Sequence, residues 1–266
     1  MIDLHCHLLP GIDDGAKDLA TSLEMARVAV ADGIHTIACT PHIYPGLYEN
    51  DAAGIRRGIV ALQRALDDAG IALKLVEGAD VHLAPDLVGA IKADRVPRLN
   101  RTRYLLLEPP HHVAPPRFEE QVFNLQANGF VPVITHPERL TWIEDNYPMF
   151  LRLARAGAWL QLTAGALTGR FGRRPKYWSQ RLLDEGPVHI IATDAHSVHR
   201  RPPLLAEAQV AAARQLGEAE AWALVRDRPS GILQNIAPER LQPASRSSPA
   251  FGARTLGFVR RWLGRG

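Results

Sequence analysis

The sequence predicts an α/β protein whose parallel strands close, or nearly close, into a barrel. Seven short apolar runs recur along the chain, and segments with helical apolar spacing separate them. Short apolar runs between helices are typical of strands that are buried on both faces of a parallel sheet. With 266 residues, of which 46% are hydrophobic, the chain is long enough for one sizeable core, as in a single α/β barrel domain.

The seven apolar runs are the predicted strands. Five of them are followed by a segment that suits a helix, so the repeat is a βα unit that places the next strand parallel to the last. Seven such units favour a closed or nearly closed barrel over a short open sheet. The predicted strands cover residues 2–4, 36–40, 73–76, 104–107, 131–135, 159–162 and 188–193.

Five helices are predicted from apolar residues that recur every three or four positions. Each ends at a glycine, a residue that favours the left-handed conformation with which many helices end. These helices cover residues 19–32, 53–69, 118–128, 150–156 and 203–216, and the glycines that follow them are Gly33, Gly70, Gly129, Gly157 and Gly217.

The folded domain is predicted to cover residues 1–242, and a basic, flexible C-terminal tail to cover residues 243–266. Proline, serine and arginine dominate residues 242–254, a composition that does not form a packed core. Residues 255–266 combine apolar side chains with arginines. A short amphipathic helix in weak contact with a membrane surface is therefore the alternative to a disordered tail.

Composition and charge argue against several functional classes. The net charge is only +3, with mixed signs along the main body, so no nucleic-acid-binding face is indicated. Cys6 and Cys39 lie in apolar, strand-like segments, so we expect no disulfide framework and a reducing cytoplasm. Neither a signal peptide nor an apolar stretch of about 18 residues is visible.

Polar residues gather where the predicted strands end, which is where barrel enzymes carry their chemistry. A single histidine there usually caps a backbone group, but six of the seven strands end in His, Asp or Glu. Carboxylates crowded at one end would repel each other unless cations neutralised them. The clusters are His5-Cys6-His7, Thr40-Pro41-His42, Glu77-Gly78-Ala79-Asp80, Glu108, Thr135-His136-Pro137-Glu138-Arg139 and Thr193-Asp194-Ala195-His196, and the exception is Gln161-Leu162-Thr163.

The spacing within two clusters suits metal ligation. His5 and His7 are two residues apart on a strand, so both side chains lie on one face, and Asp194 and His196 repeat this spacing. Imidazole together with carboxylate favours Mn, Fe or Zn over Ca or Mg. The chain has no CxxC pair, which excludes a structural zinc finger.

Covalent nucleophiles are poorly supported. A cysteine phosphatase needs an arginine six residues after its cysteine, but Ile12 follows Cys6 and Pro45 follows Cys39 at that offset. Neither a G-x-S-x-G elbow nor a P-loop is present. We interpret Cys6 as a core residue on the strand face opposite the two histidines.

Taken in order, the motifs resemble those of the polymerase-and-histidinol-phosphatase (PHP) superfamily. Within it, residues 1–240 are similar to the bacterial manganese-dependent protein-tyrosine phosphatases of capsule and exopolysaccharide loci. The motifs are His5-Cys6-His7, the loop that ends in Asp13-Asp14-Gly15, Thr40-Pro41-His42, Gly78-Ala79-Asp80, Glu108, His136-Pro137-Glu138-Arg139, Asp194-Ala195-His196 and Arg201-Pro202-Pro203.

The resemblance implies a distorted seven-stranded TIM-like α/β barrel, the PHP fold, with three divalent metal ions. Manganese is the first choice, and iron and zinc are the alternatives. Arg139 and Arg201 correspond to the substrate-binding arginines and, with His136 and Asp194, form the implied catalytic set. The implied metal ligands are His5, His7, Asp14, His42, Asp80, Glu108, His136, Asp194 and His196.

One ligand position departs from the family, which usually has glutamate where this chain has Asp80. The aspartate side chain is one methylene shorter. Glu77, three residues earlier, is a conceivable substitute, although a loop carboxylate is the simpler interpretation. We interpret Asp13 as a loop-shaping residue rather than as a ligand.

Other positions leave alternatives open. Arg200 is adjacent to Arg201 and could compete for the second substrate-binding role. Either His111 or His112, near the end of the fourth predicted strand, could line the pocket, with surface loop positions as the alternative.

The implied function is hydrolysis of phosphotyrosine in a protein by attack of a metal-bridging hydroxide. The implied partner is an autophosphorylating bacterial membrane tyrosine kinase that controls polysaccharide export. One alternative is a phosphoesterase of the same superfamily that acts on histidinol phosphate or a nucleotide. The other is a non-catalytic regulatory module, which is disfavoured because every ligand position carries a residue type that is able to bind metal.

Overall fold

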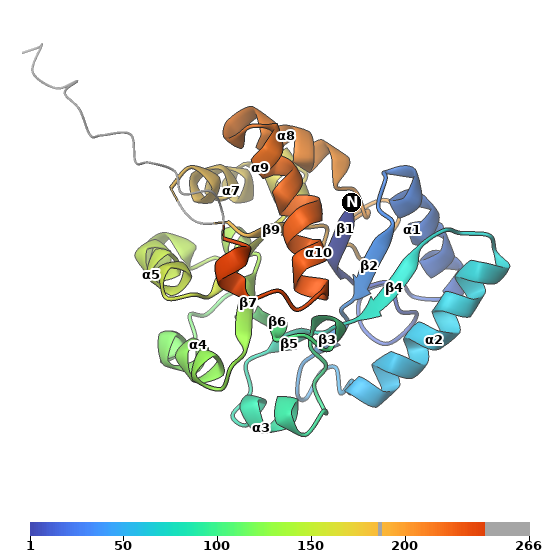
Figure 1. Cartoon of the computed structure of the whole chain (residues 1–266), viewed down its shortest axis with the longest axis horizontal. Helices are drawn as coiled ribbons and strands as arrows, with labels where there is room; N and C mark the ends of the chain where they lie inside the picture. Colours follow the sequence, from blue (N-terminus) through green and yellow to red (C-terminus); the bar gives the residue numbers. More distant parts are fainter. Residues whose placement is uncertain (186–187, 243–266) are drawn as a thin grey trace, which may run out of the picture.

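The computed structural model describes residues 1–185 and 188–242. In this part of the chain, strands lie at the centre and helices surround them (Figure 1). No helix among the described residues is long and apolar enough to cross a membrane. The predicted tail, residues 243–266, lies outside the described residues.

Every neighbouring pair of strands is parallel, as the sequence predicts for this α/β class. One sheet has the order β1-β2-β4, and the other has the order β3-β5-β6-β7-β8-β9. The described strands are β1 (Ile2–Cys6), β2 (Thr36–Cys39), β3 (His42–Ile43), β4 (Lys74–Glu77), β5 (Asp80–His82), β6 (Tyr104–Glu108), β7 (Val131–Thr135), β8 (Trp159–Thr163) and β9 (Ile190–Ala192).

The strand count differs from the predicted seven, because the second and third predicted strands each continue into a short extra strand, β3 and β5. Pro41, which has no backbone N–H, separates β2 from β3. Gly78 separates β4 from β5, and a Cβ there would lie 2.9 Å from the Thr40 side chain. A single closed seven-stranded sheet does not form within the described residues.

The two sheets meet where β1 runs beside the segment that follows β9. The Asp194 N–H donates to the His5 carbonyl at 2.7 Å, and the His7 N–H donates to the Ala195 carbonyl at 2.9 Å. Residues from opposite ends of the chain therefore share one strand-like pairing at the carboxyl ends of the strands.

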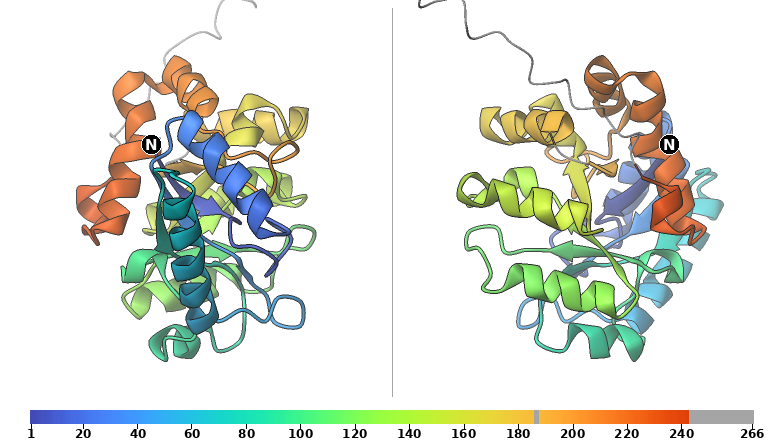
Figure 2. Two further views of the ribbon diagram at one scale, coloured as in Figure 1. Left: turned by 90° about the vertical axis from the view of Figure 1, so that its right-hand side faces the viewer. Right: turned by 60° about the vertical axis from the view of Figure 1, so that its left-hand side comes forward.

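The helices lie outside the strands in both views of Figure 2. The α-helices are α1 (Leu19–Ala31), α2 (Ala52–Asp68), α3 (Leu87–Lys92), α4 (Phe118–Ala127), α5 (Ile143–Arg155), α6 (Ala164–Thr168), α7 (Arg173–Glu185), α8 (Ala206–Leu216), α9 (Glu218–Trp222) and α10 (Arg228–Leu233). Short helical turns are η1 (Leu99–Arg101), η2 (Pro137–Arg139), η3 (Ala223–Asp227) and η4 (Pro238–Arg240).

The five predicted helices correspond to α1, α2, α4, α5 and α8. The helix-ending glycines adopt positive φ, for example +90° at Gly33 and +97° at Gly157. Helix α5 begins seven residues before the predicted position 150, at Ile143, and carries Pro148 inside it. Packing of its apolar face, which includes Tyr147 and Phe150, outweighs the local cost of that proline.

Two apolar clusters divide the core. The larger one joins the outer faces of the strands to the helices and includes Cys6, as predicted for that residue. The smaller one contains Leu4, Tyr104, Trp159 and Ile232. Because Ile232 belongs to α10, which lies against β1 in Figure 1, this cluster packs the amino-terminal ends of the strands. The polar site is thereby restricted to the opposite end.

Candidate metal centre

The structure brings all nine predicted ligands together at the carboxyl ends of the strands. They belong to groups in which the candidate ligand atoms all lie within 4.8 Å of one another. The groups are His7 with Asp14, His42 and His196; His5 with His7 and Asp80; His5 with His136 and Asp194; His42 with His82 and Glu108; and Glu108 with His111 and His136.

An irregularity in β1 directs its two histidines. The register with β2 shifts between Asp3 and Cys6, which places one extra residue in β1. Such bulges redirect side chains beside active sites. Leu4 packs in the smaller apolar cluster and Cys6 in the larger one. His5 and His7 are fully buried and face the carboxylates.

The two groups that contain His5 are centred on His5 and His7, whose Nε2 atoms lie 3.2 Å apart. His5 Nδ1 donates to Gln161 Oε1 at 2.8 Å, and His7 Nδ1 donates to Asp13 Oδ2 at 2.7 Å. A neutral imidazole carries only one N–H, so both Nε2 atoms present lone pairs to the same space. Asp194 Oδ1 lies 3.3 Å from each Nε2 atom.

Asp80 adds a second carboxylate to this group. Its Oδ2 lies 3.3 Å from His5 Nε2 and 3.6 Å from His42 Nδ1. Both Asp80 oxygens are buried and make no hydrogen bond within the described residues. Asp80 therefore points into the site in spite of its short side chain.

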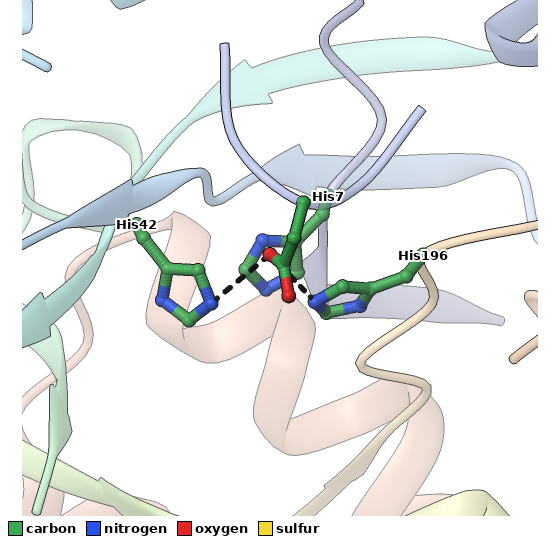
Figure 3. Close-up of side chains that lie close together, drawn as sticks. His7, His42 and His196 are labelled. Carbon is green, nitrogen blue, oxygen red and sulfur yellow. Dashed lines mark ion pairs between the residues drawn. The ribbon is translucent and has the colours of Figure 1, made fainter. Parts of the chain in front are cut away.

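Another group surrounds Asp14, and Figure 3 shows that the rings of its three histidines, His7, His42 and His196, lie close together. Asp14 Oδ1 lies 3.4 Å from His42 Nε2 and 3.3 Å from His196 Nε2, and the His7 ring stands beside them. The loop that carries Asp14 is tight, because a Cβ at Gly15 would lie 2.3 Å from the His7 carbonyl oxygen. Asp14 is the most exposed ligand, with 48% of its side chain accessible.

The two groups that remain share Glu108, at the end of β6. Glu108 Oε1 lies 3.5 Å from His136 Nε2 and 3.2 Å from His111 Nε2. Glu108 Oε2 lies 3.1 Å from His42 Nδ1, yet neither atom makes a hydrogen bond within the described residues.

These separations fit divalent cations. A zinc-like ion binds N and O ligands at about 2.0–2.2 Å, so two ligands at ordinary coordination angles are about 3.0–3.6 Å apart. The ligand pairs above lie between 3.1 and 3.6 Å. The lone pairs that face one another and the unpaired buried oxygens of Asp80 therefore fit bound metal better than a hydrogen-bonded network.

The electrostatics point the same way. Burial lowers the pKa of His5, but the Asp194 and Asp80 carboxylates raise it to about 9. For His42, burial also lowers the pKa, and the close carboxylates of Asp14 and Glu108 raise it to about 11. The carboxylates at this end of the strands thus attract positive charge, which a metal ion would supply.

Two of the candidate ligands have left-handed backbone, which is uncommon for residues other than glycine. The φ angles are +34° at His136 and +52° at Asp194, immediately after β7 and near the end of β9. Such conformations are costly and concentrate at functional sites.

Two arginines approach the ligand Asp194. Arg139 Nη1 and Arg201 Nη2 both pair with Asp194 Oδ2, the latter at 2.5 Å. The Phe171 ring lies under both guanidinium groups, with Cζ atoms 5.2 Å and 6.0 Å from its centroid. A Cβ on Gly165 would lie 2.8 Å from this ring, so the glycine leaves room for it.

The structure also distinguishes the alternatives at four positions. Glu77 pairs with Arg56 and Arg101 and belongs to no candidate metal group. Arg200 is exposed, whereas Arg201 contacts Asp194.

Asp13 both shapes its loop, by accepting from the Gly15 N–H at 2.9 Å, and orients His7. His111 faces Glu108, whereas His112 is exposed and belongs to no candidate group.

Sequence reasoning missed two residues of the site. Gln161, at the strand end regarded as the exception, is fully buried and fixes the ring of His5. His82, which was not predicted as a site residue, contacts Glu108. The spacing Asp80-x-His82 equals that of His5-x-His7 and Asp194-x-His196, so the same period-two argument would have found it.

Known proteins are similar to this chain in sequence and in fold. Tyrosine-protein phosphatase YwqE of Bacillus subtilis (strain 168) is 42% identical over 203 residues, which cover 76% of this chain and 79% of YwqE. Tyrosine-protein phosphatase CpsB of Streptococcus pneumoniae is 27% identical over 240 residues, which cover 88% of this chain and 99% of CpsB.

A solved structure gives a closely similar result. It comes from crystallographic work on YwqE from Bacillus subtilis and CpsB from Streptococcus pneumoniae, described as unique metal-dependent tyrosine phosphatases. It matches with a TM-score of 0.86 and 36% identity, and covers 92% of this chain and 100% of that chain. Residues 1–234 match the family described as capsular polysaccharide synthesis, CpsB/CapC. The chain therefore belongs to the CpsB/CapC family of capsular polysaccharide synthesis proteins.

Proposed function

We propose that the chain is a metal-dependent protein-tyrosine phosphatase, as the names of its relatives suggest, and that it acts in the cytoplasm. The observation that carries this proposal is the set of converging lone pairs and unpaired buried carboxylate oxygens beside two arginines. The proposed ligands of three divalent ions, manganese first among them, are His5, His7, Asp14, His42, Asp80, Glu108, His136, Asp194 and His196.

When bound, the ions would activate water as the nucleophile and neutralise the phosphate. Arg139 and Arg201 would bind the phosphate oxygens, since guanidinium groups form paired, charge-assisted hydrogen bonds with phosphate. Both side chains are only partly exposed, at 18% and 26%, and reach the same carboxylate oxygen. A phosphate bound next to Asp194 would therefore lie within reach of both arginines, which would stabilise charge on its oxygens during displacement.

The proposed barrel has seven positions: β1, β2 with β3, β4 with β5, β6, β7, β8 and β9. Two features support it. The pairing of β2 with β4 continues as that of β3 with β5, and backbone hydrogen bonds join β1 to the segment after β9. This distorted arrangement would direct the ends of all seven positions toward the metal centre.

We further propose that the substrate is a phosphotyrosine protein, with a membrane tyrosine kinase of polysaccharide export as the physiological partner. The capsule-related family supports this choice. The catalytic domain would end near residue 242, so a chain that stops there should retain turnover on a phosphotyrosine peptide. If the full chain and the chain that stops at residue 242 sediment equally with anionic liposomes, a membrane role for residues 243–266 is excluded.

The function is tested by turnover on a phosphotyrosine peptide, histidinol phosphate and a nucleotide, each with Mn, Zn or Mg and with a chelator. We expect metal-dependent turnover that is highest on the peptide. Asp194→Asn should abolish turnover, whereas Asp145→Asn, an exposed carboxylate on α5, should not.

Faster turnover on histidinol phosphate or the nucleotide would replace the proposed substrate with the small-phosphomonoester alternative. Full peptide turnover by the Asp194→Asn variant would refute the assigned site. A purified chain that binds less than one metal ion and turns over none of the three substrates would favour a regulatory module.

A further inference from the structure

A further imidazole, that of His82, lies at the metal centre beyond the nine predicted ligands. His82 follows Asp80 by two residues on β5, so both side chains leave the strand on one face. The register of β5 against β6 pairs His82 with Glu108, and His82 Nε2 contacts Glu108 Oε2. Only 12% of the His82 side chain is exposed, so the ring is held in a largely dry environment.

The oxygen that His82 contacts has no hydrogen-bond partner among the described residues. Glu108 Oε2 is buried, and it makes no hydrogen bond even though His42 Nδ1 lies 3.1 Å away. The ligand atoms of His42, His82 and Glu108 all lie within 4.8 Å of one another. A buried, unpaired carboxylate oxygen between two imidazoles is suited to a cation.

His42 alone does not supply the nitrogen ligand for that cation. Its Nε2 faces Asp14 at 3.4 Å, while its Nδ1 faces Glu108. A neutral imidazole has one lone pair and one N–H. When His42 Nε2 binds a metal ion beside Asp14 and His196, Nδ1 carries the hydrogen and has no lone pair for an ion at Glu108. His136 and His111 lie against the other oxygen, Glu108 Oε1. The nitrogen lone pair for an ion at Glu108 Oε2 must then come from His82.

The ring of His82 is also held in position. Tyr44 stacks on it with a centroid separation of 3.9 Å and an interplanar angle of 11°. Tyr44 is 40% exposed, so it covers the solvent side of His82 while His82 Nε2 contacts Glu108. A fixed ring loses little rotational freedom on binding an ion, which favours ligation.

We propose that His82 is a ligand, through Nε2, of the divalent cation held by Glu108. The inference rests on the proposed metal-dependent function and adds a residue to its metal centre. The mixed imidazole and carboxylate donors favour manganese, iron or zinc.

The test uses His82→Ala and His82→Gln in the full chain, with His112→Ala as the matched control, because His112 is exposed and outside the candidate groups. Metal-free proteins are titrated with MnCl2 by calorimetry, and bound ions per chain are counted by elemental mass spectrometry. We expect the unchanged chain and the control to bind alike. Both His82 variants should lose one ion, or bind one at least about tenfold more weakly.

The alternatives give different results. If His82 only donates a hydrogen bond to Glu108, the glutamine variant retains the metal affinity of the unchanged chain, which overturns the inference. Unchanged stoichiometry and affinity in the alanine variant also overturn it, without affecting the proposed function. If the unchanged chain binds no divalent ion, the proposed metal-dependent function fails and the inference fails with it.

Discussion

Gln161 provides a demanding test of the metal centre, because it contributes no ligand of its own. Its Oε1 accepts from His5 Nδ1 at 2.8 Å, and its side chain is fully buried. This contact directs the lone pair of His5 Nε2 toward Asp80 and Asp194. Gln161→Leu removes the acceptor while leaving an apolar group of comparable size.

Residues that orient metal-bound histidines typically contribute about 10–100-fold to metal affinity, or about 1.4–2.7 kcal/mol. We therefore expect the manganese affinity of Gln161→Leu to fall by this factor. Leaving the buried His5 N–H unpaired should also lower the free energy of unfolding by about 1–3 kcal/mol. Calorimetric titration with MnCl2 measures the affinity, and urea unfolding of the metal-free protein measures the stability.

Two controls sharpen the test. Gln161→Glu keeps an acceptor for the His5 N–H, so it should bind manganese at least as tightly as the unchanged chain. Gln234→Leu alters an exposed glutamine far along the sequence and should change neither quantity. A folded Gln161→Leu protein with undiminished manganese affinity would refute the role that the geometry gives to this residue.

Three further outcomes are expected. Thiol alkylation should leave peptide turnover intact, whereas a chelator should abolish it. Cys6 and Cys39 are fully buried, and burial raises the pKa of both thiols, which keeps them protonated at neutral pH. Loss of turnover on alkylation of the folded protein would contradict this prediction. Phe171→Ala should raise KM for a phosphotyrosine peptide more than it lowers kcat, because the Phe171 ring positions the guanidinium groups of Arg139 and Arg201. Each cation–π contact contributes about 0.5–2 kcal/mol. An unchanged KM in steady-state assays would argue against this positioning. Arg228→Ala should lower the free energy of unfolding, measured by urea titration, by about 3–5 kcal/mol. The reason is that Arg228 is 4% exposed and pairs with Glu220 at 2.6 Å. A loss below about 1 kcal/mol would show that this pair behaves as a weak surface ion pair.

The sequence was most informative where one physical rule governs many residues. Parallel strands present their carboxyl ends on the same side, so the clustered position of His5, His136 and Asp194 could be predicted without coordinates. The alternation of side chains along a strand also predicted that Cys6 would face away from His5 and His7. These inferences need only the strand locations and their parallel arrangement.

Features that depend on packing were harder to predict. Helix α7 was not predicted, because it has a strongly charged sequence and contains Pro175. Burial of Trp178 and Leu182 on one face accounts for its place in the fold. The split of the third predicted strand at Gly78 depends on close approach to Thr40, a residue 38 positions earlier.

The site shows the same limit. Gln161 stands at the one predicted strand end without His, Asp or Glu, and its role lies in contacting a histidine 156 residues away. His82 repeats the spacing of His5-x-His7 and Asp194-x-His196, but it lies in β5, a short strand outside the predicted strands. Contacts between distant segments, rather than local pattern, assign both residues to the metal centre.

The central claim is that the residues around His5, Asp80 and Glu108 hold the metal that a phosphotyrosine phosphatase requires. Titrating manganese into the metal-free chain, while following both bound metal and turnover of a phosphotyrosine peptide, tests it most directly. We expect no turnover without metal, and a rise in turnover that follows occupancy of the site. Full turnover by a chain shown to contain no divalent metal would contradict the claim.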